Sequence, residues 1–91
     1  PPGRPPRILT PREGVIYQRR LSDPARSGIP LDAGVDADAG AVFWFVKDDF
    51  LGRSVPGEPL VWRPSGGVHE LRAVDDLGRA ATQRVVVRTL P

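Results

Sequence analysis

Short apolar runs, broken by Pro, Gly and charged residues, recur along the whole chain. Within several runs the apolar side chains alternate with polar ones, which is the period of two typical of a half-buried β-strand. The pattern predicts strands at 8–10, 15–18, 29–35, 42–47, 60–63, 68–75 and 82–89, with a short edge segment within 48–59. We therefore expect an all-β fold, an immunoglobulin-like antiparallel β-sandwich of about seven strands. Helix is expected only as an isolated turn near 22–27.

The strongest strand signal, VFWFVK at 42–47, also predicts which side chains are buried. Neighbouring residues of a strand point to opposite faces, so Trp44 shares a face with Val42 and Val46. A large aromatic side chain on a central strand commonly fills the core between two sheets. The same alternation in the other segments predicts a core that includes Trp44, Trp62, Leu71, Val85 and Val87.

Phe43 and Phe45 point to the opposite, outer face of the same predicted strand. Sandwich topology makes 68–75 and 82–89 its neighbours, and their outer residues extend this face. The expected surface patch contains Phe43, Phe45, Arg72, Arg84, Val86 and Arg88. Aromatic residues and Arg are enriched where proteins bind one another, so the patch is a candidate interaction site. The alternative interpretation is that the aliphatic stems of the Arg side chains merely cover the Phe rings.

Length, composition and charge narrow the class of protein. The 91 residues suffice for one small domain. PPGRPPR at 1–7 predicts a Pro-rich linker, extended rather than packed, followed by the domain at 8–91. The net charge is +2, and the basic residues are not gathered in one block, so we expect no nucleic-acid binding. The chain has no Cys and no apolar run long enough to span a membrane. It begins with Pro rather than Met, so we expect a piece of a longer protein.

Candidate catalytic and metal-binding residues are sparse. His69 is the only His and alternates with Leu71, so we expect it to face inward as a packed, hydrogen-bonded side chain rather than to act as a base. DADAG at 36–40 resembles the start of a calcium loop, but Lys47 stands where the bidentate Glu would be. Turn formation is the alternative role for these Asp residues. We expect no catalytic residue, no metal and no cofactor.

Several segments together resemble one protein family. They are ILTPREGVIY (8–17), IPLDAGV (29–35), VFWFVKDDFLGR (42–53), PLVWRPSGGVHELRAVDDLGRAA (59–81) and a closing valine strand. A motif of the form Gly-x-His-x-Leu-x-x-Val-Asp-x-x-Gly is made here by Gly67, His69, Leu71, Val74, Asp75 and Gly78. The chain is similar to the C-terminal domain of class A penicillin-binding proteins of the 1C type. The similarity covers nearly the whole chain from Ile8.

The resemblance implies a setting and a role. The parent would be a bifunctional peptidoglycan synthase, periplasmic and anchored in the inner membrane. Its transpeptidase motifs Ser-x-x-Lys, Ser-x-Asn and Lys-Thr-Gly are absent here, because the chain has no Asn and its only Lys, Lys47, is preceded three residues earlier by Trp44. We therefore expect a non-catalytic accessory domain that docks on the parent's transpeptidase domain or on another cell-wall synthesis protein. The alternatives are a module that binds peptidoglycan or another carbohydrate, and a passive structural domain.

Overall fold

The computed structural model describes residues 3–91, and within that range the chain folds almost entirely into strands. The elements are β1 (Arg7–Thr10), β2 (Ile16–Arg20), η1 (Pro24–Arg26), β3 (Ile29–Gly34), β4 (Val42–Val46), β5 (Asp49–Ser54), β6 (Leu60–Trp62), β7 (Gly67–Asp75) and β8 (Ala80–Leu90). The predicted all-β fold is confirmed, and the isolated turn expected near 22–27 is present as the 3₁₀ helix η1. The described residues form eight strands rather than about seven, because the edge segment within 48–59 forms a complete strand, β5. No helix in this range is long and apolar enough to cross a membrane.

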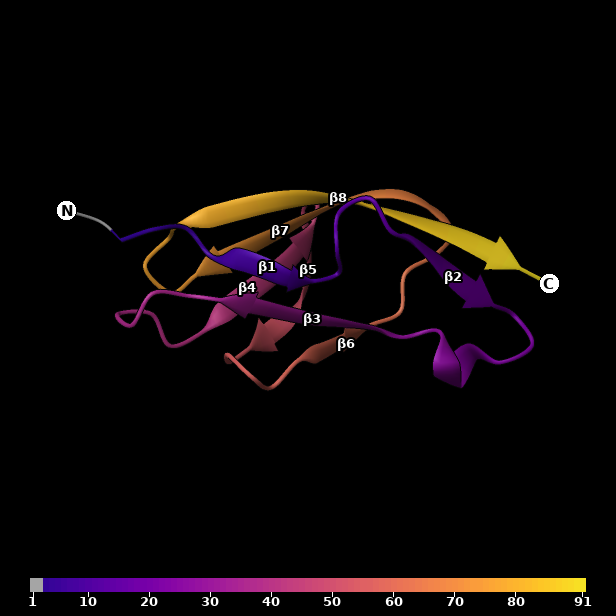
Figure 1. Ribbon diagram of the computed structural model, residues 1–91, viewed down its shortest axis with the longest axis horizontal. Helices are drawn as coiled ribbons and strands as arrows, with labels where there is room; N and C mark the ends of the chain where they lie inside the picture. The colour runs from indigo at the N-terminus through magenta and orange to yellow at the C-terminus, as the bar shows by residue number, and fades with distance from the viewer. Residues whose placement is uncertain (1–2) are drawn as a thin grey trace.

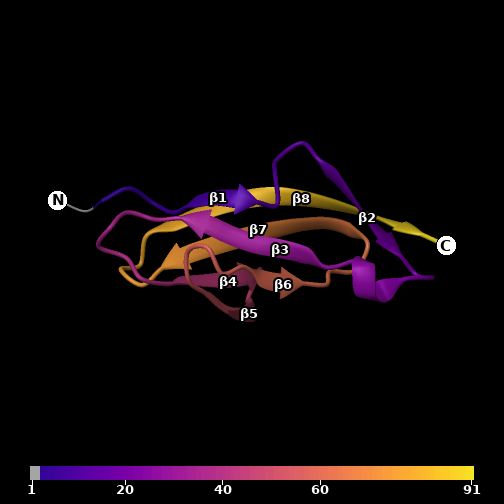
Figure 2. The same cartoon turned by 60° about the horizontal axis from the view of Figure 1, so that its bottom comes forward.

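The strands form two sheets that pack face to face (Figure 1 and Figure 2). One sheet has the strand order β1-β3-β6, and the other has the order β2-β8-β7-β4-β5. The molecule is elongated, with extents of 49 × 22 × 21 Å. The segment leading into β1 lies at one end of the long axis, and the C-terminus lies at the other (Figure 1).

The pair formed by β2 and β8 is an exception to the expected antiparallel arrangement. β2 runs parallel to β8, with Ile16 opposite Val86 and Arg20 opposite Leu90. Pro11 follows β1 and has no N–H group with which to continue the β1–β3 ladder. The chain crosses there to the other sheet without reversing direction, so β1, β2 and β8 all point toward the same end of the molecule (Figure 1). The other strand pairs are antiparallel, as predicted.

The core lies between the two sheets and is made of alternate residues from each strand. Its apolar side chains with 7% exposure or less are contributed by five strands: Ile29, Leu31, Ala33, Val42, Trp44, Trp62, Leu71, Ala73, Val85 and Val87. The indole of Trp44 is fully buried, and its Nε1–H donates to the Oγ of Ser54, 2.8 Å away. This bond satisfies the one polar group of the largest core side chain, so Trp44 can be buried without an unpaired donor.

The N-terminal segment is attached to the sandwich rather than extended away from it. The backbone N–H of Arg4 donates to the Asp36 carboxylate at 2.8 Å, and Pro6 is buried. Arg7 already belongs to β1. Residues 3–7 of the predicted linker therefore pack on the domain, while residues 1–2 lie outside the described range.

Candidate functional site

The residues of the predicted surface patch lie on the outer face of the five-stranded sheet. On this face, residues that lie opposite one another on neighbouring strands of the sheet form rows across the strands. One row brings Arg72 on β7 beside Phe45 on β4 and Phe50 on β5. The adjacent row places Phe43 opposite Val74. The predicted residues Phe43, Phe45 and Arg72 therefore meet, and the structure adds Phe50 to them.

These four side chains, Phe43, Phe45, Phe50 and Arg72, form what we call the Phe–Arg cluster. The Phe50 ring centroid lies 5.4 Å from that of Phe45 and 6.4 Å from that of Phe43, with the rings tilted. The guanidinium carbon of Arg72 lies 5.1 Å from the centroid of the Phe45 ring, within the range of a cation–π contact. Arg72 thus covers part of one ring, whereas Phe50 remains 59% exposed.

The place of Phe50 in the cluster depends on an irregularity at the sheet edge. The pairing of β4 with β5 shifts between Trp44 and Phe45, so that Phe45 faces Phe50. Gly52 takes φ +149°, and a Cβ at this position would lie 2.8 Å from the Leu60 side chain. Sequence alternation does not set this register, because it depends on how the edge strand folds back against β6. Phe50 was therefore missed, although its aromatic character beside a turn was a visible signal.

Three of the predicted patch residues, Arg84, Val86 and Arg88, lie away from the Phe–Arg cluster. Arg84 is opposite Glu70, one row further along β8 than the row of Arg72. Arg88 lies opposite Gln18 on β2, roughly 20 Å along the strand from the row of Arg72 at about 3.3 Å per residue. All six predicted residues share one outer face, but the structure brings only three of them together.

A shallow pocket adjoins the Phe–Arg cluster. It has a volume of about 360 Å³ and is lined by Lys47, Asp48, Glu70, Arg72 and Thr82. Charged residues of both signs thus border the exposed aromatic rings. An apolar centre with a polar rim is the usual anatomy of a protein–protein interface.

Trp62 and His69 lie on the inner side of the sandwich and hold one another in place. Trp62 is 7% exposed, and its ring meets the His69 ring edge to face at a centroid distance of 5.4 Å. The Nε2 of His69 lies 2.8 Å from the carbonyl oxygen of Ser65. Both tryptophans are therefore buried, and neither offers a flat surface on which a sugar could stack.

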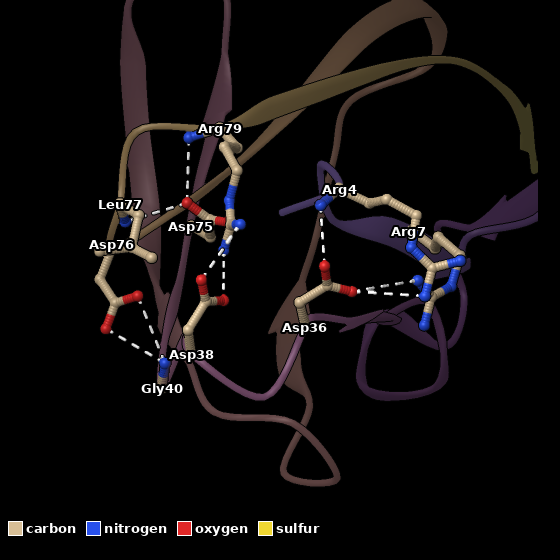
Figure 3. Close-up of polar contacts among 9 residues, drawn as sticks. All are labelled: Arg4, Arg7, Asp36, Asp38, Gly40, Asp75, Asp76, Leu77 and Arg79. Carbon is tan, nitrogen blue, oxygen red and sulfur yellow. Dashed lines mark hydrogen bonds and ion pairs between the residues drawn. The ribbon is translucent and has the colours of Figure 1, made fainter. Parts of the chain in front are cut away.

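An ion-pair network around the buried Asp75 (Figure 3) lies at the β7–β8 turn, the end of the sandwich opposite the C-terminus (Figure 1). One oxygen of the Asp75 carboxylate accepts the backbone N–H groups of Leu77 and Arg79, each at 2.9 Å. The other oxygen accepts the Nε–H of Arg79 at 2.7 Å. The far side of the same guanidinium binds Asp38 at 2.8 Å. Asp75 therefore shapes the β7–β8 turn and, through Arg79, ties it to the loop between β3 and β4.

The Asp residues of the DADAG loop separate toward different partners. Asp36 binds the backbone N–H and the guanidinium of Arg4, whereas Asp38 binds Arg79 (Figure 3). The carboxylate of Asp76 accepts the backbone N–H of Gly40 at 3.1 Å. Across residues 3–91 no group of three or more His, Asp or Glu side chains could hold a metal ion. The carboxylates of this loop serve as structural links between the N-terminal segment and two loops.

The Gly-x-His-x-Leu-x-x-Val-Asp-x-x-Gly motif has a structural explanation at most of its positions. Leu71 is fully buried in the core, and Asp75 is the acceptor at the centre of the ion-pair network. Gly78 takes φ +86° in the β7–β8 turn, a conformation that other residues rarely adopt. The named motif positions thus specify a strand and its turn, and Arg72 of the Phe–Arg cluster lies in the same segment at one of the variable positions.

Two carboxyl groups at the end of the sandwich that carries the β7–β8 turn, those of Asp75 and Asp36, have lowered pKa values. For Asp75, burial acts to raise the pKa, but the hydrogen bonds from Arg79 and Leu77 together outweigh it and hold the pKa below its ordinary value. For Asp36, the backbone N–H of Arg4 lowers the pKa most, and burial opposes it. Hydrogen bonds to Asp38 and Asp75 raise the pKa of Arg79, so this guanidinium stays charged.

We expect the domain to lose stability in acid as these carboxyl groups take up protons. A group whose pKa is lower in the folded than in the unfolded chain stabilises the fold above the unfolded pKa, about 3.9 for Asp. That contribution disappears as the pH falls through the folded pKa values of Asp36 and Asp75. Melting temperatures measured between pH 7 and pH 2 should be level to about pH 5 and then fall steeply. A melting temperature that stays constant down to pH 2 would contradict the assignment.

The chain matches a known protein family in sequence and a known module in fold. A family model described as the Penicillin-Binding Protein C-terminus Family matches residues 2–87. No curated protein matches the chain in sequence. Among solved structures, a fibronectin(III)-like module of CbhA from Clostridium thermocellum is similar over 94% of this chain and 99% of its own, with a TM-score of 0.70 and 14% sequence identity. At this identity the likeness shows a shared immunoglobulin-like sandwich fold.

Proposed function

The chain belongs to the penicillin-binding protein C-terminus family, and from this premise we propose that it is a non-catalytic accessory domain of a bifunctional peptidoglycan synthase. Its role is to dock on the transpeptidase domain of the parent protein or on another protein of cell-wall synthesis. The proposal places the domain in the periplasm, as part of a protein anchored in the inner membrane.

The observation that carries the docking role is the exposed Phe–Arg cluster. Phe50 is 59% exposed although it is one of the largest apolar side chains of the domain. Its ring lies tilted against two further aromatic rings, Phe43 and Phe45, and the guanidinium of Arg72 lies over the Phe45 ring. Aromatic residues and Arg dominate the binding energy of many interfaces because they bury a large area and carry directional contacts.

Three side chains that could serve in acyl transfer, those of His69, Ser54 and Ser27, are held by contacts within the fold, which supports a non-catalytic role. His69 is held between Ser65 and Trp62. The hydroxyl of Ser54 accepts the indole N–H of Trp44 in the core, and that of Ser27 bonds to backbone groups of its own loop. A nucleophile with an adjacent general base, the minimum for acyl transfer, is thus not assembled among these residues.

Carbohydrate binding is the second candidate function, and the same surface would serve it. Aromatic faces stack on sugar rings, and Arg pairs with peptide carboxylates. The burial of Trp44 and Trp62 leaves only Phe rings for stacking, which makes a protein partner the better fit. The third candidate is a passive structural domain, in which the Phe–Arg cluster binds neither protein nor carbohydrate.

The test is to remove the most exposed ring and to measure docking. Phe50→Ser should weaken binding of the domain to the transpeptidase domain of its parent by at least about tenfold, as expected for a central interface residue. Leu77→Ser is the matched control, because Leu77 is 57% exposed but lies in the β7–β8 turn. Calorimetry gives the affinities, and thermal melting shows that both variants remain folded.

The outcomes separate the candidate functions. A loss of affinity with Phe50→Ser and not with Leu77→Ser supports docking through the cluster. If the domain does not dock on the protein, but soluble peptidoglycan fragments shift the amide signals of residues 43–50 and 72, carbohydrate binding replaces docking as the function of the cluster. If neither ligand affects the cluster, the passive role stands.

A further inference from the structure

Three arginines converge on a pocket at the end of the sandwich where β2 and β6 finish. Arg19 and Arg20 close β2, and Arg63 directly follows β6. They line a pocket of about 190 Å³ together with Leu21, Pro24, Ser27 and Pro64. We call this the basic pocket. Pro24 of η1 is one of its lining residues, and no residue of the Phe–Arg cluster lines it. The end of β2 and η1 lie at the C-terminal end of the long axis (Figure 1 and Figure 2).

The backbone around the basic pocket is firmly held. The Oγ of Ser27 accepts the backbone N–H of Arg20 at 3.0 Å and lies 3.2 Å from the carbonyl oxygen of Asp23, to which it donates. The N–H of Leu21 donates to the carbonyl oxygen of Leu90 at 3.0 Å. These bonds fix the positions from which the two β2 arginines project, so the pocket is preorganised rather than formed by a loose loop.

Gly28 lets the third arginine approach this loop. A Cβ at Gly28 would lie 2.6 Å from the Val61 side chain and 3.8 Å from the guanidinium carbon of Arg63. Only a residue without a side chain leaves this space open. The loop between β2 and β3 and the end of β6, which are far apart in the chain, can therefore meet around one pocket.

The positive charge of the basic pocket is not balanced by the protein that surrounds it. Among residues 3–91, Arg19, Arg20 and Arg63 form no ion pair with a carboxylate. The acidic residue of the same loop, Asp23, pairs with Arg26 at 3.3 Å, and no Asp or Glu lines the pocket. Like charges held close together repel one another, and a bound anion removes that repulsion.

We propose that the basic pocket is a binding site for a phosphate group, either free or carried on a lipid headgroup. A phosphate matches the site in charge, because three arginines and no carboxylate of the described residues line the pocket, whereas a phosphate carries up to about two negative charges and three acceptor oxygens. Each Arg can present two parallel N–H donors to such oxygens. The volume of about 190 Å³ is several times the roughly 30 Å³ of a water molecule, so a tetrahedral oxyanion fits.

The rim of the basic pocket suits a ligand that has an apolar part. Leu21 is 57% exposed and borders the pocket beside the arginines. Exposed apolar side chains next to basic ones are typical of segments that rest on the boundary between lipid headgroups and acyl chains. The site therefore accommodates both sources of phosphate, and the experiment has to distinguish them.

The experiment uses the 91-residue domain with two probes. Inorganic phosphate is titrated into the labelled domain while amide signals are recorded, and sedimentation is measured with vesicles of phosphatidylglycerol and phosphatidylcholine or of phosphatidylcholine alone. The double variant Arg19→Gln/Arg63→Gln should weaken phosphate binding at least tenfold. Arg84→Gln is the matched control, because Arg84 is an exposed arginine on the outer face of β8, outside the pocket. A well-dispersed amide spectrum shows that each variant is folded. If the double variant is not folded, Arg20→Gln is used in its place.

Each result either supports or overturns the proposal. Phosphate-induced shifts confined to the amide signals of residues 19–28 and of Arg63, lost in the double variant and kept in the control, support the site. Additional binding to the anionic vesicles, lost in the double variant and in Leu21→Ser, identifies the lipid headgroup as the source. Binding of phosphate without vesicle binding identifies a free phosphate. No shifts at 10 mM phosphate together with no vesicle binding, or equal weakening in the control, overturns the proposal. Because the Phe–Arg cluster is intact in these variants, failure here leaves the docking role untouched.

Discussion

Replacing Trp44 by alanine should lower the free energy of unfolding by about 4 kcal/mol, the typical cost of removing a large aromatic side chain from a packed core. Trp44 has no exposed surface and is the largest fully buried side chain of the domain. A domain of this length has a free energy of unfolding of roughly 5–14 kcal/mol, so this one substitution removes a large fraction of it. Urea denaturation of the purified domain, followed by circular dichroism, measures the loss.

The control for this prediction is Phe50→Ala, which removes an aromatic ring from the exposed face of the neighbouring strand. Phe50 is 59% exposed and its ring lies against two other surface rings, so we expect a loss within about 1 kcal/mol. A loss for Trp44→Ala no larger than that for Phe50→Ala would contradict the core assignment. Trp44→Phe, combined with Ser54→Ala in a double-mutant cycle, isolates the hydrogen bond between the indole N–H and the Ser54 hydroxyl.

Replacing Asp75 by asparagine should lower the free energy of unfolding by about 3 kcal/mol, because it removes one partner of a buried ion pair. The side chain of Asp75 is fully buried and that of Arg79 is 11% exposed. An amide cannot accept both the two backbone N–H groups and the Nε–H of Arg79, since one of its two polar atoms is itself a donor. The melting temperature at pH 7 should fall by more than about 10 °C in a domain of this size.

Asp76→Asn is the matched control for this second prediction. Asp76 is the next residue along the chain, but it is exposed and accepts only the backbone N–H of Gly40. Its loss should cost less than about 1 kcal/mol. Asp75→Asn should also flatten the acid-induced fall of the melting temperature, because one of the two carboxyl groups with a lowered pKa is then missing. Equal stability of the two variants would show that the network contributes nothing.

The candidate interaction surface was predictable only in part. Alternation along 42–47 placed Phe43 and Phe45 on the outer face, and the pairing of β4 with β7 brings Arg72 beside them. It could not include Phe50, because the edge strand shifts its register at a bulge. It also joined Arg88 to the same patch, since a sequence pattern assigns a face and says nothing about distance along the strand.

The sequence by itself determined the all-β fold, the positions of the strands other than β5, and core-facing residues such as Trp44 and Leu71. It could do so because the direction of each side chain on a strand is a local property of the backbone. The tertiary structure decided which strands are neighbours, and hence the parallel pairing of β2 with β8. It also decided that Arg79 joins Asp75 to Asp38, which is 41 positions away. The basic pocket arises in the same way, because it exists only where two distant strand ends meet. Such contacts depend on loop paths and strand register, which no repeating pattern in the sequence encodes.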